Sequence, residues 1–197
     1  HVHIYLLDDE QRNLALAAGA GAAGQTMVAG GHAIPLSYEH SLVARAARTG
    51  QPIIVNDVTR EPDFLPNPLL PETKSEMAVP MSLGMEIIGV LDVQANTPNR
   101  FTEIDKNLQL TLANQIAVAI SNARLFEETQ KALADVEVLY MGSSNLVRAS
   151  ALDEILQALV ASTALYRFDR ATIEFFDNPW TDVETPSALK VMAVWEQ

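Results

Sequence analysis

The sequence predicts an α+β fold in which helices flank an antiparallel β-sheet, and a long C-terminal linker helix follows that sheet. Two pairs of β-prone segments are each joined by a short turn, as in antiparallel hairpins. Short stretches between them place apolar residues at helical spacing. The stretch from Phe101 to Met141 contains neither glycine nor proline, so nothing interrupts a helix of roughly 60 Å. Hairpins combined with separate amphipathic helices are typical of α+β folds.

The composition indicates a globular chain with an acidic surface. Of its 197 residues, 48% are hydrophobic and 19% are charged, which is typical of one or two folded domains. The formal net charge of −12 argues against a nucleic-acid partner, because phosphate binding needs clustered Lys and Arg. The chain has no cysteine, which removes thiolate chemistry and is compatible with the cytoplasm, where we expect the protein to reside. No apolar run approaches the length of a membrane span, so we expect no membrane contact from this segment.

The first two strands predict a β-hairpin. Residues 1–7 are apolar and β-prone, residues 8–10 are acidic and mark a turn, and residues 13–19 form the second strand. The chain enters this hairpin directly from His1, so we interpret it as a piece of a longer protein.

A glycine-rich stretch follows over residues 18–31. Gly19, Gly21 and Gly24 match the G-x-G-x-x-G phosphate-binding motif. An antiparallel hairpin precedes them, however, where that motif requires a βαβ unit. We therefore expect a flexible crossover here and no nucleotide phosphate site.

The next elements are short. Residues 32–36 predict an edge strand, because the proline among them cannot donate to a central ladder. Residues 41–48 predict a helix with one apolar face, and residues 51–55 predict a strand. Residues 56–71 contain four prolines and must be largely irregular. A loop of this length is uncommon in a compact domain unless it has a use.

A second hairpin is predicted from residues 76–81 and 86–94. The second of these strands is apolar at nearly every position, so it should be central in the sheet. Asp92 is the exception within it. An unpaired buried carboxylate is costly, so either Asp92 ends the strand and pairs with a backbone or Arg group, or it faces a polar pocket. The first of these alternatives is favoured.

The long helix begins with a capping signal and then changes character. Thr102 is the predicted N-cap, with Asp105 three residues on, as in a capping box. In the first half, large apolar residues recur at i, i+4 spacing and predict the face that packs on the sheet. They are Ile104, Leu108, Leu112, Ile116 and Ile120, with Leu110, Ala113 and Ala117 beside them.

The second half of this helix predicts a narrower seam of the coiled-coil kind, through which two copies would form a homodimer. Apolar residues there recur every seven positions, with Val136 between the last two. They are Ala119, Phe126, Leu133 and Tyr140. A single helix with a frayed polar end is the alternative.

A new unit follows Gly142. It contains an amphipathic helix over residues 151–165 and strands over residues 170–177 and 189–195, joined by a connection over 178–186. We therefore divide the chain into a sensor domain over residues 1–126, a connecting helix and turn over 127–150, and a partial second unit over 151–197.

Several segments in this order resemble the GAF domain family. The first unit lacks that family's opening helix, and residues 152–195 resemble more weakly the opening of a second GAF domain. The segments that carry the resemblance of the first unit are Ser41–Pro52, Ser75–Met81, Ile88–Gln94 and Phe101–Asp105.

The resemblance implies a sensory or dimerising module of a bacterial signal-transduction protein, such as a two-component system. It implies an antiparallel sheet with helices on one face and a ligand pocket on the other. We therefore expect a regulatory domain that is not an enzyme, needs no cofactor, and binds an unidentified small molecule. A ligand-free dimerisation scaffold is the main alternative, and a cryptic catalyst using Asp92 and a histidine is a weaker one.

Relatives with enzymatic or nucleotide-binding chemistry fit less well. Those that reduce free methionine sulfoxide, or attach a bilin, need cysteines that this chain lacks. Those that bind cyclic nucleotides carry an N-K…F-x-x-x-D-E pattern. Phe101 and Asp105 match part of it, but Lys106 stands where Glu is expected.

The candidate ligand-binding residues are few, and none forms a metal site. His1 and His3 share one strand face, but no third ligand is placed beside them. We expect them to be surface or partly buried strand residues. The pocket-lining candidates are Tyr5, Asp57, Phe64, Met77 and Asp92.

Overall fold

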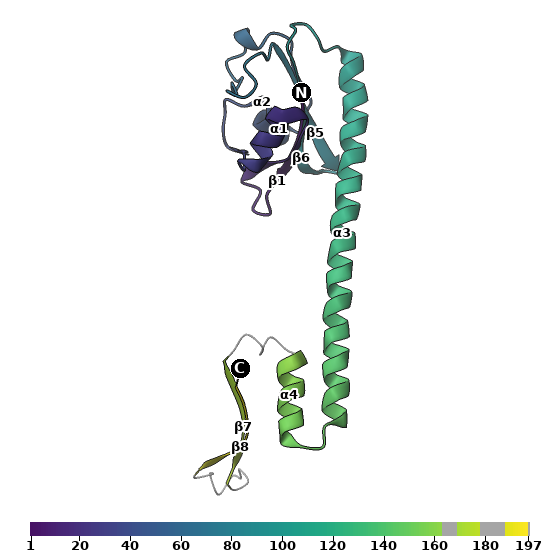
Figure 1. Ribbon diagram of the computed structural model, residues 1–197. Helices are drawn as coiled ribbons and strands as arrows, with labels where there is room; N and C mark the ends of the chain where they lie inside the picture. The colour runs from purple at the N-terminus through teal and green to yellow at the C-terminus, as the bar shows by residue number, and fades with distance from the viewer. Residues whose placement is uncertain (163–168, 178–187, 197) are drawn as a thin grey trace, which may run out of the picture. The chain divides into compact units, whose positions relative to one another are not determined.

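The computed structural model describes residues 1–162, 169–177 and 188–196 (Figure 1). The chain divides into two compact units, His1–Ala123 and Arg124–Gln197, each of which is described by itself. The boundary between the units falls within one helix, α3 (Glu103–Arg148).

The first unit is built on a six-stranded antiparallel sheet with the strand order β3-β2-β1-β6-β5-β4. The predicted fold class and both predicted hairpins are confirmed, and β6 is central between β1 and β5. The strands are β1 (Val2–Leu7), β2 (Asn13–Gly19), β3 (Ala33–Pro35), β4 (Ile53–Val55), β5 (Ser75–Leu83) and β6 (Glu86–Ala95).

Helices cover both faces of this sheet, and each face has its own apolar core. On one face, α1 (Gly21–Ala29) and α2 (Leu42–Thr49) pack over side chains that include Tyr5 and Val90. On the other face, the first part of α3 packs over a second cluster. Because strand side chains alternate, neighbouring residues in one strand belong to opposite cores.

Helix α1 corrects one expectation, because the glycine-rich stretch is a helix and not a flexible crossover. Gly24 on α1 lies directly against Gly19 at the end of β2, where a Cβ atom on Gly19 would sit 2.7 Å from the Gly24 Cα atom. The glycines thus let the helix backbone approach the strand closely. Met27, farther along α1, is buried in the core.

Helix α2 forms as predicted, and its ends are capped. The Ala44 backbone N–H donates to Ser41 Oγ over 3.2 Å at the N-terminus. Gly50 closes the C-terminus in the left-handed conformation, with φ of 64°. Beyond β4, the proline-rich loop is irregular apart from one 3₁₀ turn, η1 (Val58–Arg60).

Helix α3 begins with the predicted capping box. Thr102 N–H donates to Asp105 Oδ2 over 2.9 Å, and Asp105 N–H donates back to Thr102 Oγ1 over 3.3 Å. The helix does not stop at Gly142, as the sequence suggested, but continues to Arg148 over 46 residues. A single glycine costs a helix about 1 kcal/mol, which does not suffice to end it.

The predicted face of α3 meets the sheet only in part. Ala113 and Ala117 are fully buried against the sheet. In contrast, Ile104 is 80% exposed, Leu108 is 57% exposed and Leu112 is 39% exposed. Leu110 and Ile116 also pack against this core, so the predicted burial is wrong for the three exposed residues and not for the whole face.

The second unit contains the predicted element types. Helix α4 (Leu152–Ser162) is followed by the antiparallel pair β7 (Arg170–Phe176) and β8 (Leu189–Glu196). The predicted connection over residues 178–186 and the end of the predicted helix beyond Ser162 lie outside the described residues. Within the described residues, no helix is long and apolar enough to cross a membrane.

Candidate functional site

A cavity of about 450 Å³ lies on the face of the sheet that α1 and α2 cover. Its wall comes from four strands (β1, β3, β5 and β6), from helices α1 and α2, and from the proline-rich loop. Its volume falls within the range of small-molecule sites in proteins. The lining residues that the argument uses are Tyr5, His32, Asn67, Glu76, Asp92 and Gln94.

Asp92 is the most unusual residue of this cavity. It is 0% exposed and lies within β6, which continues to Ala95, so it does not end the strand as we had favoured. Asp92 Oδ2 lies 3.1 Å from His3 Nδ1 and accepts a 2.8 Å hydrogen bond from Gln94 Nε2. Asp92 Oδ1 is buried and has no hydrogen-bond partner among the described residues. The partners are therefore a histidine and an amide, and not the backbone or arginine group that we expected.

His3 is also fully buried, which corrects the expectation of a surface or partly buried strand residue. It stands directly opposite Asp92 in the antiparallel pairing of β1 with β6. For His3 Nδ1 to donate in this contact, the hydrogen of the neutral imidazole must lie on that nitrogen. His3 Nε2 is buried with no hydrogen-bond partner among the described residues.

Glu76 completes an acidic cluster, and sequence reasoning missed it. The side chain is in the cavity wall, and the residue is 4% exposed. Burial raises the pKa of the Glu76 carboxyl well above its ordinary value, and the charge of Asp92 raises it further, while Arg45 opposes the shift. The signal was present in the alternation of β5, where Glu76 must face away from the α3 side that Met77 occupies.

The two ring side chains beside these acids are perturbed in the same environment. Burial, followed by the charges of Asp92 and Glu76, raises the pKa of the Tyr5 hydroxyl. Burial also lowers the pKa of His32, with a smaller contribution from His3. The rings of Tyr5 and His32 meet edge to face at 6.0 Å. Tyr5 and His32 therefore favour their uncharged forms in this site.

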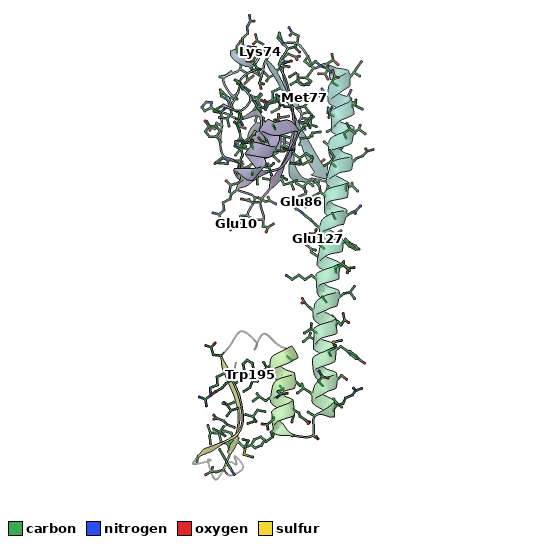
Figure 2. The ribbon with its side chains drawn as sticks, viewed as in Figure 1. Glu10, Lys74, Met77, Glu86, Glu127 and Trp195 are labelled. Atoms are coloured by element: carbon green, nitrogen blue, oxygen red, sulfur yellow. The ribbon has the colours of Figure 1, made fainter. Side chains whose placement is uncertain are left out.

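The structure brings together two of the five predicted pocket residues. Tyr5 and Asp92 both line the cavity, and the other three do not. Phe64 packs against the edge of the core on the cavity side. Met77 belongs to the opposite core, beside α3 (Figure 2). Asp57 instead accepts hydrogen bonds from Thr59 at the start of the 3₁₀ turn, which lower the pKa of its carboxyl.

The proline-rich loop forms part of the cavity wall through residues 65–69. Two contacts tie it to the helices. Arg45 on α2 pairs with Asp63 over 2.8 Å and with Glu61 over 3.2 Å. Asn67 Nδ2 lies 3.4 Å from the Met27 sulfur on α1. The loop that we expected to have a use is therefore anchored at the cavity.

The charge of the lining residues determines which class of ligand the cavity can bind. Glu76 and Asp92 contribute carboxyl groups, and no Lys or Arg occurs among the described residues that line it. Most of the remaining wall is apolar, and its polar groups are few. The arrangement favours a ligand that combines an apolar body with a positively charged hydrogen-bond donor.

Comparisons with known proteins agree with this architecture. The sequence profile described as "GAF domain" matches residues 1–121. This chain therefore belongs to the GAF domain family. No curated protein sequence matches it.

Solved structures of GAF domains share the fold. The GAF domain of a phosphoenolpyruvate-protein phosphotransferase from Acinetobacter is 25% identical, with a TM-score of 0.53 over 64% of this chain and 73% of that one. The corresponding domain from Coxiella burnetii is 22% identical, with a TM-score of 0.57 over 64% of this chain and 74% of that one. A free methionine-R-sulfoxide reductase from Neisseria meningitidis, solved with its substrate, is 26% identical, with a TM-score of 0.51 over 63% of this chain and 68% of that one.

Proposed function

We propose that the first unit is a regulatory sensor domain of a signal-transduction protein, and that its cavity binds a small molecule carrying an ammonium group. The observation that carries this proposal is the buried Asp92 Oδ1, which has no partner among the described residues. A buried acceptor without a hydrogen bond costs about 1–3 kcal/mol, and more when it is charged. An ammonium donor would satisfy Asp92 Oδ1 and face Glu76 across the cavity.

The acidic wall argues against the cyclic-nucleotide alternative. A cyclic phosphate is an anion, and it would lie beside Glu76 and Asp92 with no Lys or Arg in the described lining to offset them. Like charges held in a site of low dielectric repel strongly. The partial match at Phe101 and Asp105 is explained by the start of α3, where Asp105 serves in the capping box.

The likeness to the Neisseria reductase supports a ligand of amino-acid size. That protein acts on a free amino-acid derivative, as its name states, and such compounds carry an ammonium group. This chain contains no cysteine, so a thiol-based reduction has no residue here to perform it. We therefore propose binding without turnover.

The loop that lines the cavity is tied at its first residue to the chain just before α3, which supports a regulatory role. Asn56 follows β4 and opens the loop that continues to the cavity wall. Its side chain accepts from Phe101 N–H over 3.0 Å and donates to the Phe101 carbonyl over 2.9 Å, just before α3 begins. A ligand that favours one position of this loop would therefore bias the start of the helix.

Hexylamine is expected to raise the melting temperature of the chain near neutral pH, whereas 1-hexanol, which has the same apolar body without the charge, is not. The reason is that only the ammonium group can donate to Asp92 with full charge. Replacing Asp92 with Asn should weaken hexylamine binding at least about tenfold, or ~1.4 kcal/mol. Differential scanning fluorimetry and calorimetric titration measure the two effects.

Asp57→Asn is the matched control for Asp92→Asn, because Asp57 lies outside the cavity lining. The proposed ammonium site is wrong if hexylamine and 1-hexanol change the melting temperature of the wild-type chain equally, and if butylamine and octylamine also have the same effect as the corresponding alcohols. The ligand-free scaffold would then be the better explanation of the fold.

The second half of α3 supports the homodimer that we propose. Leu133 is 58% exposed, and its neighbours along the helix are exposed as well. Exposed apolar residues along the predicted seam are typical of a helix that pairs with another. The exposed apolar residues of this part are Leu125, Phe126, Leu133, Val136, Val138, Leu139, Tyr140, Met141 and Val147.

Leu133→Glu should weaken self-association by about tenfold or more, or ~1.4 kcal/mol, because it places a charge in the apolar seam of both copies. Lys131→Glu is the control, since it changes charge two residues away among the polar positions of the same turn. Sedimentation velocity over a concentration series measures both. Sedimentation that is the same for both variants and the wild type would contradict pairing through this seam.

A further inference from the structure

We propose that the cavity takes up its ammonium ligand in exchange for a proton held by the Glu76 carboxyl, so that ligand affinity rises with pH. This inference rests on the proposed function and adds a regulatory property to the same site. It makes the domain respond to pH and to the ligand together.

The strand register places the two carboxyl groups within reach of one ligand group. Glu76 stands opposite Gln94 in the β5–β6 pairing, and Asp92 stands opposite Ala78. Glu76 and Asp92 are therefore diagonal neighbours on the same face, a relation that corresponds to roughly 7–8 Å. Both side chains line the cavity. An ammonium group placed between them can donate to both.

Without a ligand, the surroundings disfavour two negative charges in this cluster. From β1, His3 and Tyr5 lie on the same face, and His32 approaches between α1 and β3. His3 is already engaged by Asp92 Oδ2. Two carboxylates that share a buried site do not both ionise readily, so one of them retains its proton.

The remaining positive charge near Glu76 comes from Arg45 on α2 and is largely committed elsewhere. Arg45 pairs with Asp63 and Glu61 on the proline-rich loop. Its effect on Glu76 is to lower the pKa of that carboxyl, but burial and Asp92 outweigh it. Burial and the neighbouring Asp92 thus favour the proton on Glu76, while Asp92 accepts a hydrogen bond from Gln94 and contacts His3.

Binding then balances as an exchange of one cation for another. The ligand enters with its ammonium group protonated, the O–H bond of the Glu76 carboxyl breaks, and the proton passes to solvent buffer. The Glu76 carboxylate and the ammonium group remain as an ion pair, and no covalent bond to the ligand forms. The net charge of the site is unchanged, which avoids burying an uncompensated charge.

The sign of the pH dependence follows from this exchange. The pKa of Glu76 lies well above its ordinary value of 4.5 in the free protein. At a pH between 4.5 and this raised pKa, Glu76 carries a proton in the free protein but not in the complex. Protons therefore compete with the ligand at lower pH. Affinity for the amine therefore rises as pH increases from about 4.5 through the raised pKa, and it levels off above it.

Calorimetric titration of the full 197-residue chain with hexylamine, in phosphate and in Tris at a series of pH values from about 5 to about 8, tests the exchange. The two buffers differ in ionisation enthalpy, so the difference between their measured heats counts released protons. Hexylamine stays protonated throughout, because alkyl ammonium groups titrate near pH 10. We expect a release that approaches one proton per ligand bound at a pH below the raised pKa.

The variant Glu76→Gln identifies the source of the proton. We expect it to fold, because it replaces a protonated carboxyl with an amide of the same shape, and to bind hexylamine with equal heats in the two buffers. Its affinity should change less than about twofold across the pH series. A wild-type chain that binds hexylamine with equal heats in both buffers at every pH would overturn the exchange and leave the ammonium site standing. Absence of binding would overturn both.

The stability of the free protein gives a second measurement that needs no ligand. In the folded state Glu76 binds its proton more tightly than in the unfolded state, so its ionisation costs stability as pH rises. Glu76→Gln should therefore have a higher melting temperature than the wild type near pH 8, with the difference shrinking toward pH 4.5. An equal or lower melting temperature of the variant near pH 8 would contradict the proton on Glu76.

Discussion

Gly89→Ala is expected to destabilise the first unit by about 3 kcal/mol or more, one of the largest effects of any single methyl group in this fold. Gly89 lies in the central strand β6, opposite Leu6 on β1 and Met81 on β5. A Cβ atom there would collide with the Tyr5 carbonyl oxygen and approach the Met81 Cε atom to 2.7 Å. The methionine can move, but the carbonyl belongs to the neighbouring strand. The strand pairing itself would have to shift.

Urea denaturation measures this loss, and Gly84→Ala in the turn of the same hairpin is its control. Gly84 has a φ of 63° and nothing within 4 Å of an added Cβ atom. Alanine there should reduce the free energy of unfolding by only about 1 kcal/mol, the cost of holding a residue with a Cβ atom in the left-handed conformation. Equal costs for the two variants would show that the close approach of β1 to β6 at Gly89 is not real.

His3→Leu is expected to cost about 3–5 kcal/mol, because it removes one partner of a fully buried polar pair. Asp92 would keep a single hydrogen bond, from Gln94, and its charge would have no histidine beside it. Leucine fills a similar volume, so the expected loss reports the unpaired carboxylate and not a cavity. Urea denaturation at neutral pH measures it.

The double variant His3→Leu with Asp92→Leu separates the electrostatic from the packing contribution. Removing both polar partners leaves an apolar pair, which is often neutral relative to the buried pair it replaces. We expect the double variant to be more stable than His3→Leu alone. A double variant that loses the sum of the two single losses would show that His3 and Asp92 do not interact.

The two hairpins of the sheet were predictable because their pattern is local. Each hairpin joins two strands that are neighbours in the sequence, and the apolar character of β6 indicated its central position. Helix α1 was not predictable in this way, since Gly21 and Gly24 have poor helix propensity. Gly24 lets the backbone of α1 lie close to Gly19 on β2, a contact that no local pattern shows.

The cavity was only half predictable, for the same reason. Asp92 was identified from its contrast with the apolar strand around it, but its partner His3 lies 89 positions away. Glu76 could have been predicted from strand alternation, once it was known which face of β5 turns toward the cavity. Met77 was placed in the pocket because adjacent residues were not assigned to opposite faces.

The packing face of α3 was predictable only in part, because a regular apolar stripe does not show where along the helix the contact with the sheet lies. Ile104 and Leu108 form a regular apolar stripe, which normally indicates a core-facing surface. Helix α3 meets the sheet at Ala113 and Ala117, with Leu110 and Ile116 packed against the same core. Ile104 and Leu108 lie outside this contact and are exposed.

Contact through alanine has a mechanical consequence. Ala113 and Ala117, the fully buried residues of this contact, have methyl side chains that form only shallow ridges against the strands. Leu110 and Ile116 pack against the same core with larger side chains. Steric resistance to a small slide of α3 along its axis therefore comes mainly from Leu110 and Ile116, whereas bending away from the sheet would expose the second core.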